Sequence, residues 1–225
     1  MLAFASVVID VDSTLCGVEG IDFLAERRGP EVSTRVVALT NQAMQGEVPL
    51  EAVYAHRLTV IKPTRADVAA LADAYVKTLA PGAAHAIARM RRASARMILV
   101  SGGIREAIQP VARALGFAED ALFAVRLRFH ADGNYQSFDE HSPLTMQHGK
   151  PEIVTKLIAD GQLPRRVLAV GDGATDALLR GVADTFAAYT GFASRANVVA
   201  QSDMTISSFA ELATVVTGET EPHRE

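Results

Sequence analysis

Two aspartates, Asp10 and Asp12, follow the apolar run Val7-Val8-Ile9 and are separated by a single residue. A continuous run of β-branched apolar residues is typical of a buried parallel strand. Open sheets of this kind bind ligands in the crevice beyond the carboxyl ends of their strands, where the two carboxylates would lie. Two acids in one pocket, with nothing basic beside them in sequence, need a compensating positive charge. We therefore expect a divalent metal ion, a lysine from elsewhere in the chain, or both.

Two further strands are predicted to end in turns that could do chemistry. The run 97–100 is followed by Ser101-Gly102-Gly103, and the run 167–170 is followed by Gly171-Asp172-Gly173. Taken singly, an Asp-x-Asp or a Ser-Gly-Gly is more often an ordinary turn. Because neighbouring parallel strands would bring all three ends to one edge of a sheet, their joint occurrence indicates a shared site.

The acids of this site suggest a metal. Asp172 and one of the first pair would supply the hard oxygen ligands that Mg²⁺ takes from carboxylates, together with substrate phosphate and water. The candidate metal ligands are therefore Asp10, Asp12 and Asp172, and the expected cofactor is Mg²⁺.

The remaining residue types suggest an anion. Ser101 and the backbone N–H groups of Gly102 and Gly103, leading into a helix, suit a phosphate. Lys150, just before a predicted helix, could add a positive charge, although a lone lysine is usually solvated. Asp176, one helical turn after Asp172, could orient a ligand or Lys150, or could simply complement the helix dipole.

The elements that would position these residues alternate between strand and helix. This alternation predicts an α/β fold with a doubly wound parallel sheet. The expected strands are 6–9, 97–100, 122–124 and 167–170, with weaker candidates at 185–189 and 204–206. The expected helices are 83–92, 104–115 and 151–160, and a hairpin is expected over 127–138 around Asp132-Gly133.

Residues 16–77 show only helical patterns, with no convincing strand between them. Inserted directly after the first strand, they are predicted to form a small helical cap. The core domain would then comprise residues 1–15 and 78–217. The polar residues 218–225 are expected to be a disordered tail.

Composition narrows the class of protein. The chain has 225 residues, 49% of them hydrophobic, and a formal net charge of −4, which favours neither nucleic acid nor an anionic membrane as a partner. No apolar segment reaches the roughly 18 residues needed to span a bilayer, and the first residues do not read as a signal peptide. One cysteine, Cys16, fits a reducing compartment. A cytoplasmic protein is expected, with its oligomeric state left open.

The motifs together resemble those of haloacid dehalogenase superfamily phosphatases, and most closely the phosphoserine phosphatase family. The resemblance covers nearly the whole chain. The segments similar to the family's four motifs are, in order, Asp10-Val11-Asp12-Ser13-Thr14, Val100-Ser101-Gly102-Gly103, Lys150, and Gly171-Asp172-Gly173-Ala174-Thr175-Asp176.

The resemblance implies that Asp10 is the nucleophile, Asp12 the general acid/base and Asp172 a magnesium ligand, with Ser101 and Lys150 holding the phosphoryl group. A carboxylate nucleophile divides hydrolysis into formation and breakdown of an aspartyl-phosphate. Asp12 must carry a proton for the leaving alkoxide, so we expect its pKa to be raised in the substrate complex.

The resemblance also implies a substrate, which the cap would select. Glu19 matches the family glutamate that meets the substrate ammonium, Arg57 matches the arginine that meets its carboxylate, and Met44 matches an apolar residue near the substrate. A guanidinium can hold a carboxylate bidentately. The expected ligand is a small phosphorylated metabolite, phosphoserine first, although an isolated Glu or Arg on a helix is normally a surface residue.

Three residues depart from the family pattern. Thr175, counted with the substrate-binding residues, stands where asparagine is usual, Ile104 replaces a common aromatic residue, and Leu50 replaces a common phenylalanine. Two alternatives therefore stay open. The chain could act on another phosphorylated metabolite, or pass the phosphoryl group to an alcohol. It could also be an idle fold that binds a phosphorylated ligand to regulate a partner, although binding alone requires no acid/base.

Overall fold

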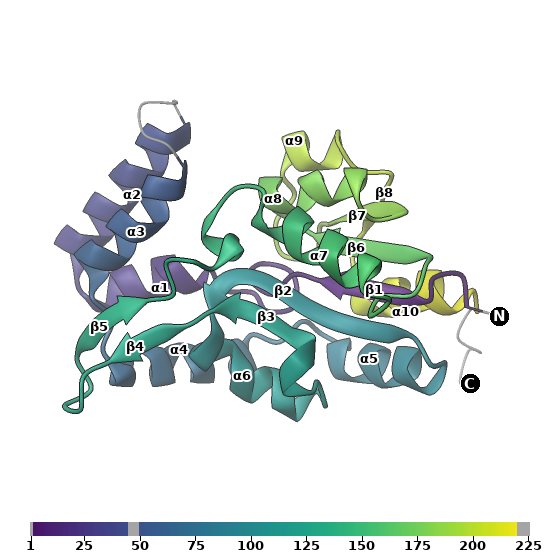
Figure 1. Ribbon diagram of the computed structural model, residues 1–225, viewed down its shortest axis with the longest axis horizontal. Helices are drawn as coiled ribbons and strands as arrows, with labels where there is room; N and C mark the ends of the chain where they lie inside the picture. The colour runs from purple at the N-terminus through teal and green to yellow at the C-terminus, as the bar shows by residue number, and fades with distance from the viewer. Residues whose placement is uncertain (1, 45–49, 220–225) are drawn as a thin grey trace.

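The computed structural model describes residues 2–44 and 50–219, leaving aside the side chains of residues 40–44 and 50–52. Strands and helices alternate along most of the chain (Figure 1). The strands are β1 (Ser6–Ile9), β2 (Arg96–Ile104), β3 (Leu122–Val125), β4 (Leu127–Phe129), β5 (Tyr135–Phe138), β6 (Val167–Gly171), β7 (Thr185–Tyr189) and β8 (Met204–Ile206). The α-helices are α1 (Gly20–Arg27), α2 (Pro30–Met44), α3 (Leu50–Ile61), α4 (Arg65–Lys77), α5 (Ala83–Arg92), α6 (Arg105–Ala114), α7 (Gly149–Ala159), α8 (Ala174–Ala177), α9 (Ala196–Val199) and α10 (Phe209–Thr217).

The central feature is a six-stranded parallel sheet with the order β3-β2-β1-β6-β7-β8. Figure 1 shows α7 and α8 on one side of this sheet and α5 and α6 on the other. The predicted doubly wound parallel sheet is confirmed, including the two weaker strand candidates. The expected hairpin is present as the antiparallel pair β4 and β5.

The strand order places the site. The chain crosses from β1 to β2 and β3 on one side, and later returns to β6, β7 and β8 on the other side of β1. The carboxyl end of β1 is therefore the topological switch point, where open α/β sheets form their ligand crevice. All four residues of β1 are buried, because the strand lies in the middle of the sheet with helices over both faces.

Two element boundaries differ from the expectation in ways that affect the site. Strand β2 runs on through Ser101, Gly102 and Gly103 to Ile104, with a register shift against β3 between Val100 and Ile104. The sequence predicts a turn at these glycines, but in the structure they are part of the strand, at the position of the register shift. Helix α7 begins at Gly149, so Lys150 lies in its first turn and not before it.

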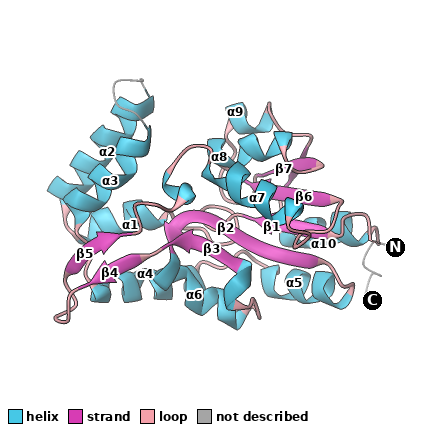
Figure 2. Cartoon of the chain, in the orientation of Figure 1, coloured by secondary structure: helices cyan, strands magenta, loops and turns pink. Residues whose placement is uncertain are grey.

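Helices α1 to α4 follow β1, and the pair α2 and α3 stands at one end of the molecule (Figure 2). Helix α4 begins with a capping box, in which the Thr64 side chain accepts a hydrogen bond from Asp67 N and the Asp67 side chain accepts one from Thr64 N. Helix α4 also packs closely against α6. We propose that residues 16–77 act as the cap, with α4 as its contact with the core.

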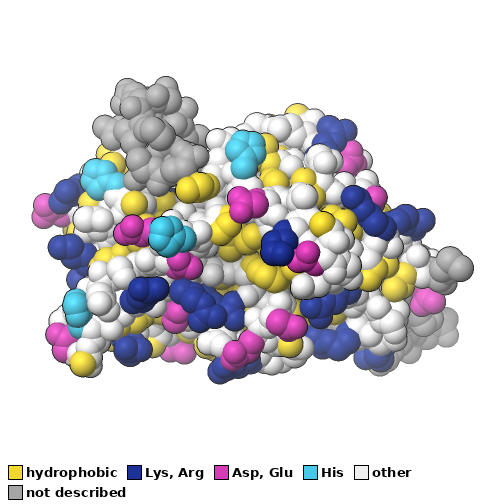
Figure 3. All heavy atoms as spheres, in the orientation of Figure 1, with side chains coloured by type: hydrophobic (Ala, Val, Ile, Leu, Met, Phe, Trp, Pro, Cys, Tyr) yellow, Lys and Arg dark blue, Asp and Glu magenta, His cyan; other side chains and the backbone are white. Residues whose placement is uncertain are grey.

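The surface and the outer segments complete the description. The face in Figure 3 carries Lys and Arg interspersed with Asp and Glu. Within the described part of the chain, no helix is long and apolar enough to cross a membrane. The side chains of Met44 and Leu50 lie outside the described residues, as does most of the expected tail, residues 220–225.

Candidate active site

The three predicted motif ends meet in one pocket. Asp10 directly follows β1, Gly102 and Gly103 lie in β2, and Asp172 directly follows β6. These residues line a cavity of about 480 Å³ together with residues of α1, α3, α7 and α8. A cavity of this size can enclose a small metabolite.

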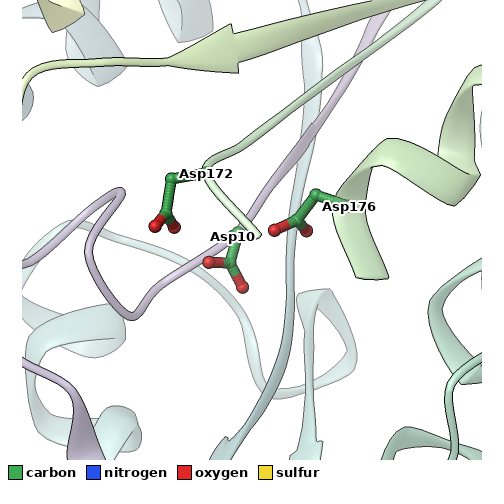
Figure 4. Close-up of side chains that lie close together, drawn as sticks. All are labelled: Asp10, Asp172 and Asp176. Carbon is green, nitrogen blue, oxygen red and sulfur yellow. The ribbon is translucent and has the colours of Figure 1, made fainter. Parts of the chain in front are cut away.

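Three carboxylates converge at the base of this pocket. One oxygen each from Asp10, Asp172 and Asp176 lies within 4.8 Å of the others, and all three residues are buried. Figure 4 shows their side chains pointing toward one another. The Thr14 hydroxyl donates to Asp172 Oδ1 at 3.0 Å, and the guanidinium of Arg195 lies against Asp172 Oδ2 as an ion-pair partner.

Lys150 supplies the positive charge that the sequence required. Its Nζ lies 2.5 Å from Asp10 Oδ1 and 2.7 Å from Asp176 Oδ1, and only 7% of the residue is exposed. Burial alone would lower the pKa of Lys150, but the two carboxylates outweigh it and raise the pKa. Asp176 thus orients Lys150, which was one of its two suggested roles, and it also belongs to the carboxylate group.

Asp10 lies in a strongly perturbed environment. Burial raises the pKa of its carboxyl group well above the usual value, and the nearby charge of Asp176 adds to this, while Lys150 opposes it. Without a further cation, the site therefore disfavours the ionised form of Asp10, which is the form a nucleophile needs.

Asp12 is held differently from Asp10. Its Oδ1 accepts hydrogen bonds from the Tyr75 hydroxyl and from Gly20 N, both at 2.7 Å, and its Oδ2 accepts one from the Ser101 hydroxyl at 3.0 Å. The Asp12 carboxylate is therefore not one of the three that converge at the metal-binding position. Its assignment as a metal ligand stays a prediction.

The pKa of Asp12 is raised, first by burial and then by the nearby charge of Glu19. Hydrogen bonds from Tyr75, Gly20 and Ser101 oppose the rise, because they stabilise the carboxylate. The direction agrees with the role of a proton donor, which needs a pKa closer to neutral pH than that of an ordinary aspartate.

Ser101 is completely buried and already engaged. Its hydroxyl donates to Asp12 and accepts a hydrogen bond from Gly103 N at 2.8 Å. A Cβ at position 103 would lie 2.7 Å from Asp12 Oδ2, so glycine is needed for this close approach. Ser101 is therefore well placed to hold Asp12, and a role in binding phosphate stays a prediction.

The proposed cap contributes Glu19, Asp22, Tyr54 and Arg57 to the same pocket, which Thr175 of α8 also lines. Glu19 Oε1 accepts hydrogen bonds from the Ser13 hydroxyl at 2.6 Å and from Arg195 at 3.1 Å. The predicted cap residues Glu19 and Arg57 therefore line the same pocket as Asp10.

Arg57 is the cap residue best prepared for a ligand. Its Nε is buried, and no atom of the described residues accepts a hydrogen bond from it. Burial lowers the pKa of Arg57, while Tyr54, Asp22 and Glu19 oppose this effect. A buried guanidinium N–H without an acceptor is costly, and an anionic ligand in the pocket would satisfy it.

Sequence reasoning missed Arg195 and Tyr75. Arg195 precedes α9, beyond the carboxyl end of β7, and lies against both Asp172 and Glu19. Its position after a parallel strand could have indicated it, but β7 was only a weak strand candidate. Tyr75 resembles any other buried residue of an amphipathic helix, so nothing in its local sequence indicated the contact with Asp12.

The donor set fits a divalent cation. Among the described residues, the three converging carboxylates of Asp10, Asp172 and Asp176 are paired with two cations, Lys150 and Arg195. Converging carboxylate oxygens are what Mg²⁺ and similar hard ions prefer. Asp10, Asp172 and Asp176 are the side chains that could hold such an ion.

Comparison with known proteins agrees with this geometry. Residues 7–179 match the family model of the haloacid dehalogenase-like hydrolases. The chain is 38% identical over 209 residues to the chloroplastic phosphoserine phosphatase of Arabidopsis thaliana, covering 92% of this chain and 70% of that protein. It is 36% identical over 207 residues to the phosphoserine phosphatase of Bos taurus, covering 92% and 91%.

A solved structure is similar as well. It is a phospho-aspartyl intermediate analogue of phosphoserine phosphatase, with a TM-score of 0.73 and 26% identity, covering 91% of this chain and 93% of that one. With the parallel sheet, the acidic cluster and these relatives, we conclude that the chain belongs to the haloacid dehalogenase-like hydrolases and is a phosphoric monoester hydrolase related to the phosphoserine phosphatases.

Proposed function

We propose that this enzyme hydrolyses O-phospho-L-serine to L-serine and phosphate through an aspartyl-phosphate on Asp10. The observation that carries the proposal is the buried Nε of Arg57, which has no hydrogen-bond acceptor among the described residues and lies in the same pocket as Asp10 and Lys150. One end of the pocket thus offers a nucleophile, and the cap offers a cation for a carboxylate. The relatives named above support the choice of phosphoserine.

In the first step, a carboxylate oxygen of Asp10 attacks the phosphorus atom and the bond from phosphorus to the seryl oxygen breaks. Asp12 gives its proton to the departing alkoxide, so that neutral serine leaves. Lys150, held between Asp10 and Asp176, stabilises negative charge on the transferring phosphoryl group. The backbone N–H groups of Gly102 and Gly103 are proposed to bind the same group.

In the second step, a water molecule attacks the phosphorus atom of the aspartyl-phosphate. Asp12, now a carboxylate, takes a proton from that water, and the bond from phosphorus to Asp10 breaks to release phosphate. Asp12 then carries the proton it needs for the next cycle. A bound Mg²⁺ would neutralise charge on the phosphoryl oxygens and allow Asp10 to stay ionised.

The amino-acid end of the substrate is assigned to the cap. Arg57 would bind the substrate carboxylate, and Glu19 would bind the ammonium group. Asp22 lines the same pocket, and its pKa is raised by burial and by Glu19, which is the effect expected where two carboxylates share a region that could receive a cation.

The test is phosphate release from L-phosphoserine and a panel of small phosphate monoesters, with Mg²⁺ and with a chelator. We expect Mg²⁺-dependent release that favours phosphoserine. Turnover of other esters but not phosphoserine would point to a different metabolite. Transfer to an added alcohol in place of water would show a phosphotransferase, and no turnover of any ester would leave the idle, ligand-binding alternative.

The role of Arg57 gives a sharper prediction. In Arg57→Ala, KM for L-phosphoserine should rise about 10- to 100-fold, because the variant loses a charge-assisted contact with the substrate carboxylate. KM for O-phosphoethanolamine, which has the ammonium group but no carboxylate, should change far less. The steady-state kinetics of both substrates measure this difference.

Arg65→Ala is the matched control. Arg65 is an exposed cap arginine that lies over the Phe129 ring and does not line the pocket. It should leave both KM values unchanged. Equal effects of Arg57→Ala on the two substrates would show that Arg57 does not bind the carboxylate.

A further inference from the structure

Asp12 has an uneven set of hydrogen-bond donors. Its Oδ1 receives two, from the Tyr75 hydroxyl and Gly20 N, and its Oδ2 receives one, from the Ser101 hydroxyl. A carboxylate oxygen has two lone pairs in its plane, so the two donors occupy Oδ1. Oδ2 keeps one lone pair that receives no hydrogen bond from the described residues, so a proton on Asp12 belongs on Oδ2.

Tyr75 is built into this arrangement. It lies in α4, is completely buried, and its hydroxyl donates to Asp12 Oδ1 at 2.7 Å. A phenol is an O–H donor at ordinary pH, so the hydroxyl can donate to this carboxylate oxygen. A buried hydroxyl with one well-placed acceptor has a fixed orientation.

Gly20 belongs to the same unit. It is the first residue of α1, and a Cβ at this position would lie 2.4 Å from the Tyr75 hydroxyl and 3.1 Å from Asp12 Oδ1. Only glycine therefore allows α1 to bring its N–H and the Tyr75 hydroxyl to the same carboxylate oxygen. The first and the last helix of the proposed cap thus meet at Asp12.

We propose that Tyr75 is a positioning residue for the acid/base step, holding Asp12 Oδ1 so that Oδ2 delivers the proton to the leaving group and receives it from water. The inference rests on the proposed function, because it assigns Asp12 as the acid/base. Tyr75 itself does not contact the reacting atoms.

The variant Tyr75→Phe removes this hydroxyl and keeps the buried ring. Its effect should depend on the leaving group. The leaving group of L-phosphoserine is the strongly basic alkoxide of serine, which needs the proton of Asp12. The leaving group of p-nitrophenyl phosphate is the weakly basic p-nitrophenolate, which needs no proton. With Mg²⁺ present, phosphoenzyme formation from phosphoserine, measured by rapid acid quench, should slow about 10-fold or more.

With p-nitrophenyl phosphate, the same variant should form phosphoenzyme within about 2-fold of the wild-type rate. Hydrolysis of the phosphoenzyme still needs Asp12 as a base and should slow about 10-fold. Phosphoenzyme should therefore accumulate, and nitrophenolate should appear in a larger burst than with the wild type. Asp12→Asn should also slow phosphoenzyme formation from phosphoserine much more than from p-nitrophenyl phosphate, and by a larger factor than Tyr75→Phe.

Two further variants keep the test independent of folding. Gly20→Ala must displace the Tyr75 hydroxyl. Like Tyr75→Phe, it should slow phosphoenzyme formation from phosphoserine but not from p-nitrophenyl phosphate. Tyr54→Phe removes another buried cap hydroxyl, which donates to the Gly102 carbonyl at 2.9 Å and not to Asp12. It should change phosphoenzyme formation from both substrates by the same factor.

If Tyr75→Phe slows phosphoenzyme formation from both substrates equally, or from neither, the proposed role of Tyr75 is overturned. The proposed function would still stand in that case, as long as the wild type turns over phosphoserine. If the wild type turns over no alkyl phosphate, both proposals fail. If it turns over a different alkyl phosphate, only the substrate assignment fails, and that ester replaces phosphoserine in the comparison.

Discussion

Asp10→Asn is expected to reduce phosphate release from L-phosphoserine by roughly 10⁴-fold or more, the scale seen when a covalent nucleophile is removed. An amide oxygen has no negative charge with which to attack phosphorus, so no aspartyl-phosphate can form. The substitution barely changes the size of the side chain, and the parallel strand β1 and its buried neighbours should stay in place. Steady-state phosphate release measures the loss.

The same variant should be more stable to unfolding than the wild type at alkaline pH, because the environment of Asp10 disfavours its ionised form. The folded pKa of Asp10 is raised above the unfolded value of about 3.9. Between these two values the folded protein binds a proton that the unfolded chain has lost, so the free energy of unfolding falls as the pH rises through that window. Asp10→Asn lacks this penalty. In a chelator, its melting temperature should therefore exceed that of the wild type near pH 8, and the difference should shrink toward pH 4.

Asp160→Asn provides the control for both measurements. Asp160 is a surface carboxylate paired with Lys156, outside the pocket. It should keep wild-type activity and should not show the same gain in melting temperature near pH 8. Near-normal phosphate release by Asp10→Asn would refute the assignment of Asp10 as the nucleophile.

Lys150→Met should have the second large effect. The ammonium group lies between Asp10 and Asp176, and methionine fills the same space without the charge. Phosphate release should fall roughly 10²- to 10³-fold, because a preorganised cation that stabilises the transferring group is lost. The metal-free protein should also lose about 3–5 kcal/mol of unfolding free energy, since breaking a buried ion pair leaves its acids uncompensated.

A divalent cation should recover part of this stability, because it supplies positive charge to the same carboxylates. Lys156→Met is the matched control, as Lys156 lies on the same helix, is largely exposed and, among the described residues, pairs with the surface residue Asp160. Thermal melting with and without Mg²⁺, and phosphate release, measure both effects. Lys150→Met with wild-type stability and activity would show that the buried pair is not functional.

The core of the site could be predicted because each of its motifs is local. An apolar run ending in Asp10 identifies a buried strand and its carboxyl end together, and the same holds for the strand before Asp172. Parallel pairing of β1 with β2 and β6 then brings the ends together. Asp10 and Asp172, which follow β1 and β6, converge for this reason.

The less accurate predictions concern residues whose roles depend on tertiary contacts. Gly102 and Gly103 suggest a turn locally, but β2 continues to Ile104, where it pairs with Val125 of β3. Tyr75 reaches Asp12 across 63 positions of the chain, and the helical pattern of α4 cannot distinguish a buried hydroxyl that serves the site from one that merely packs. The location of Arg195 could be predicted only after β7 had been placed next to β6 in the sheet.

The most direct test of the account is to trap the covalent intermediate on the wild-type enzyme. After mixing with L-phosphoserine and Mg²⁺, the protein is quenched in acid and treated with borohydride, which reduces an acyl phosphate to an alcohol and converts an aspartyl-phosphate into homoserine. Mass spectrometry then locates the changed residue. Homoserine is expected at position 10 and nowhere else. Homoserine at another aspartate, or none during active turnover, would contradict it.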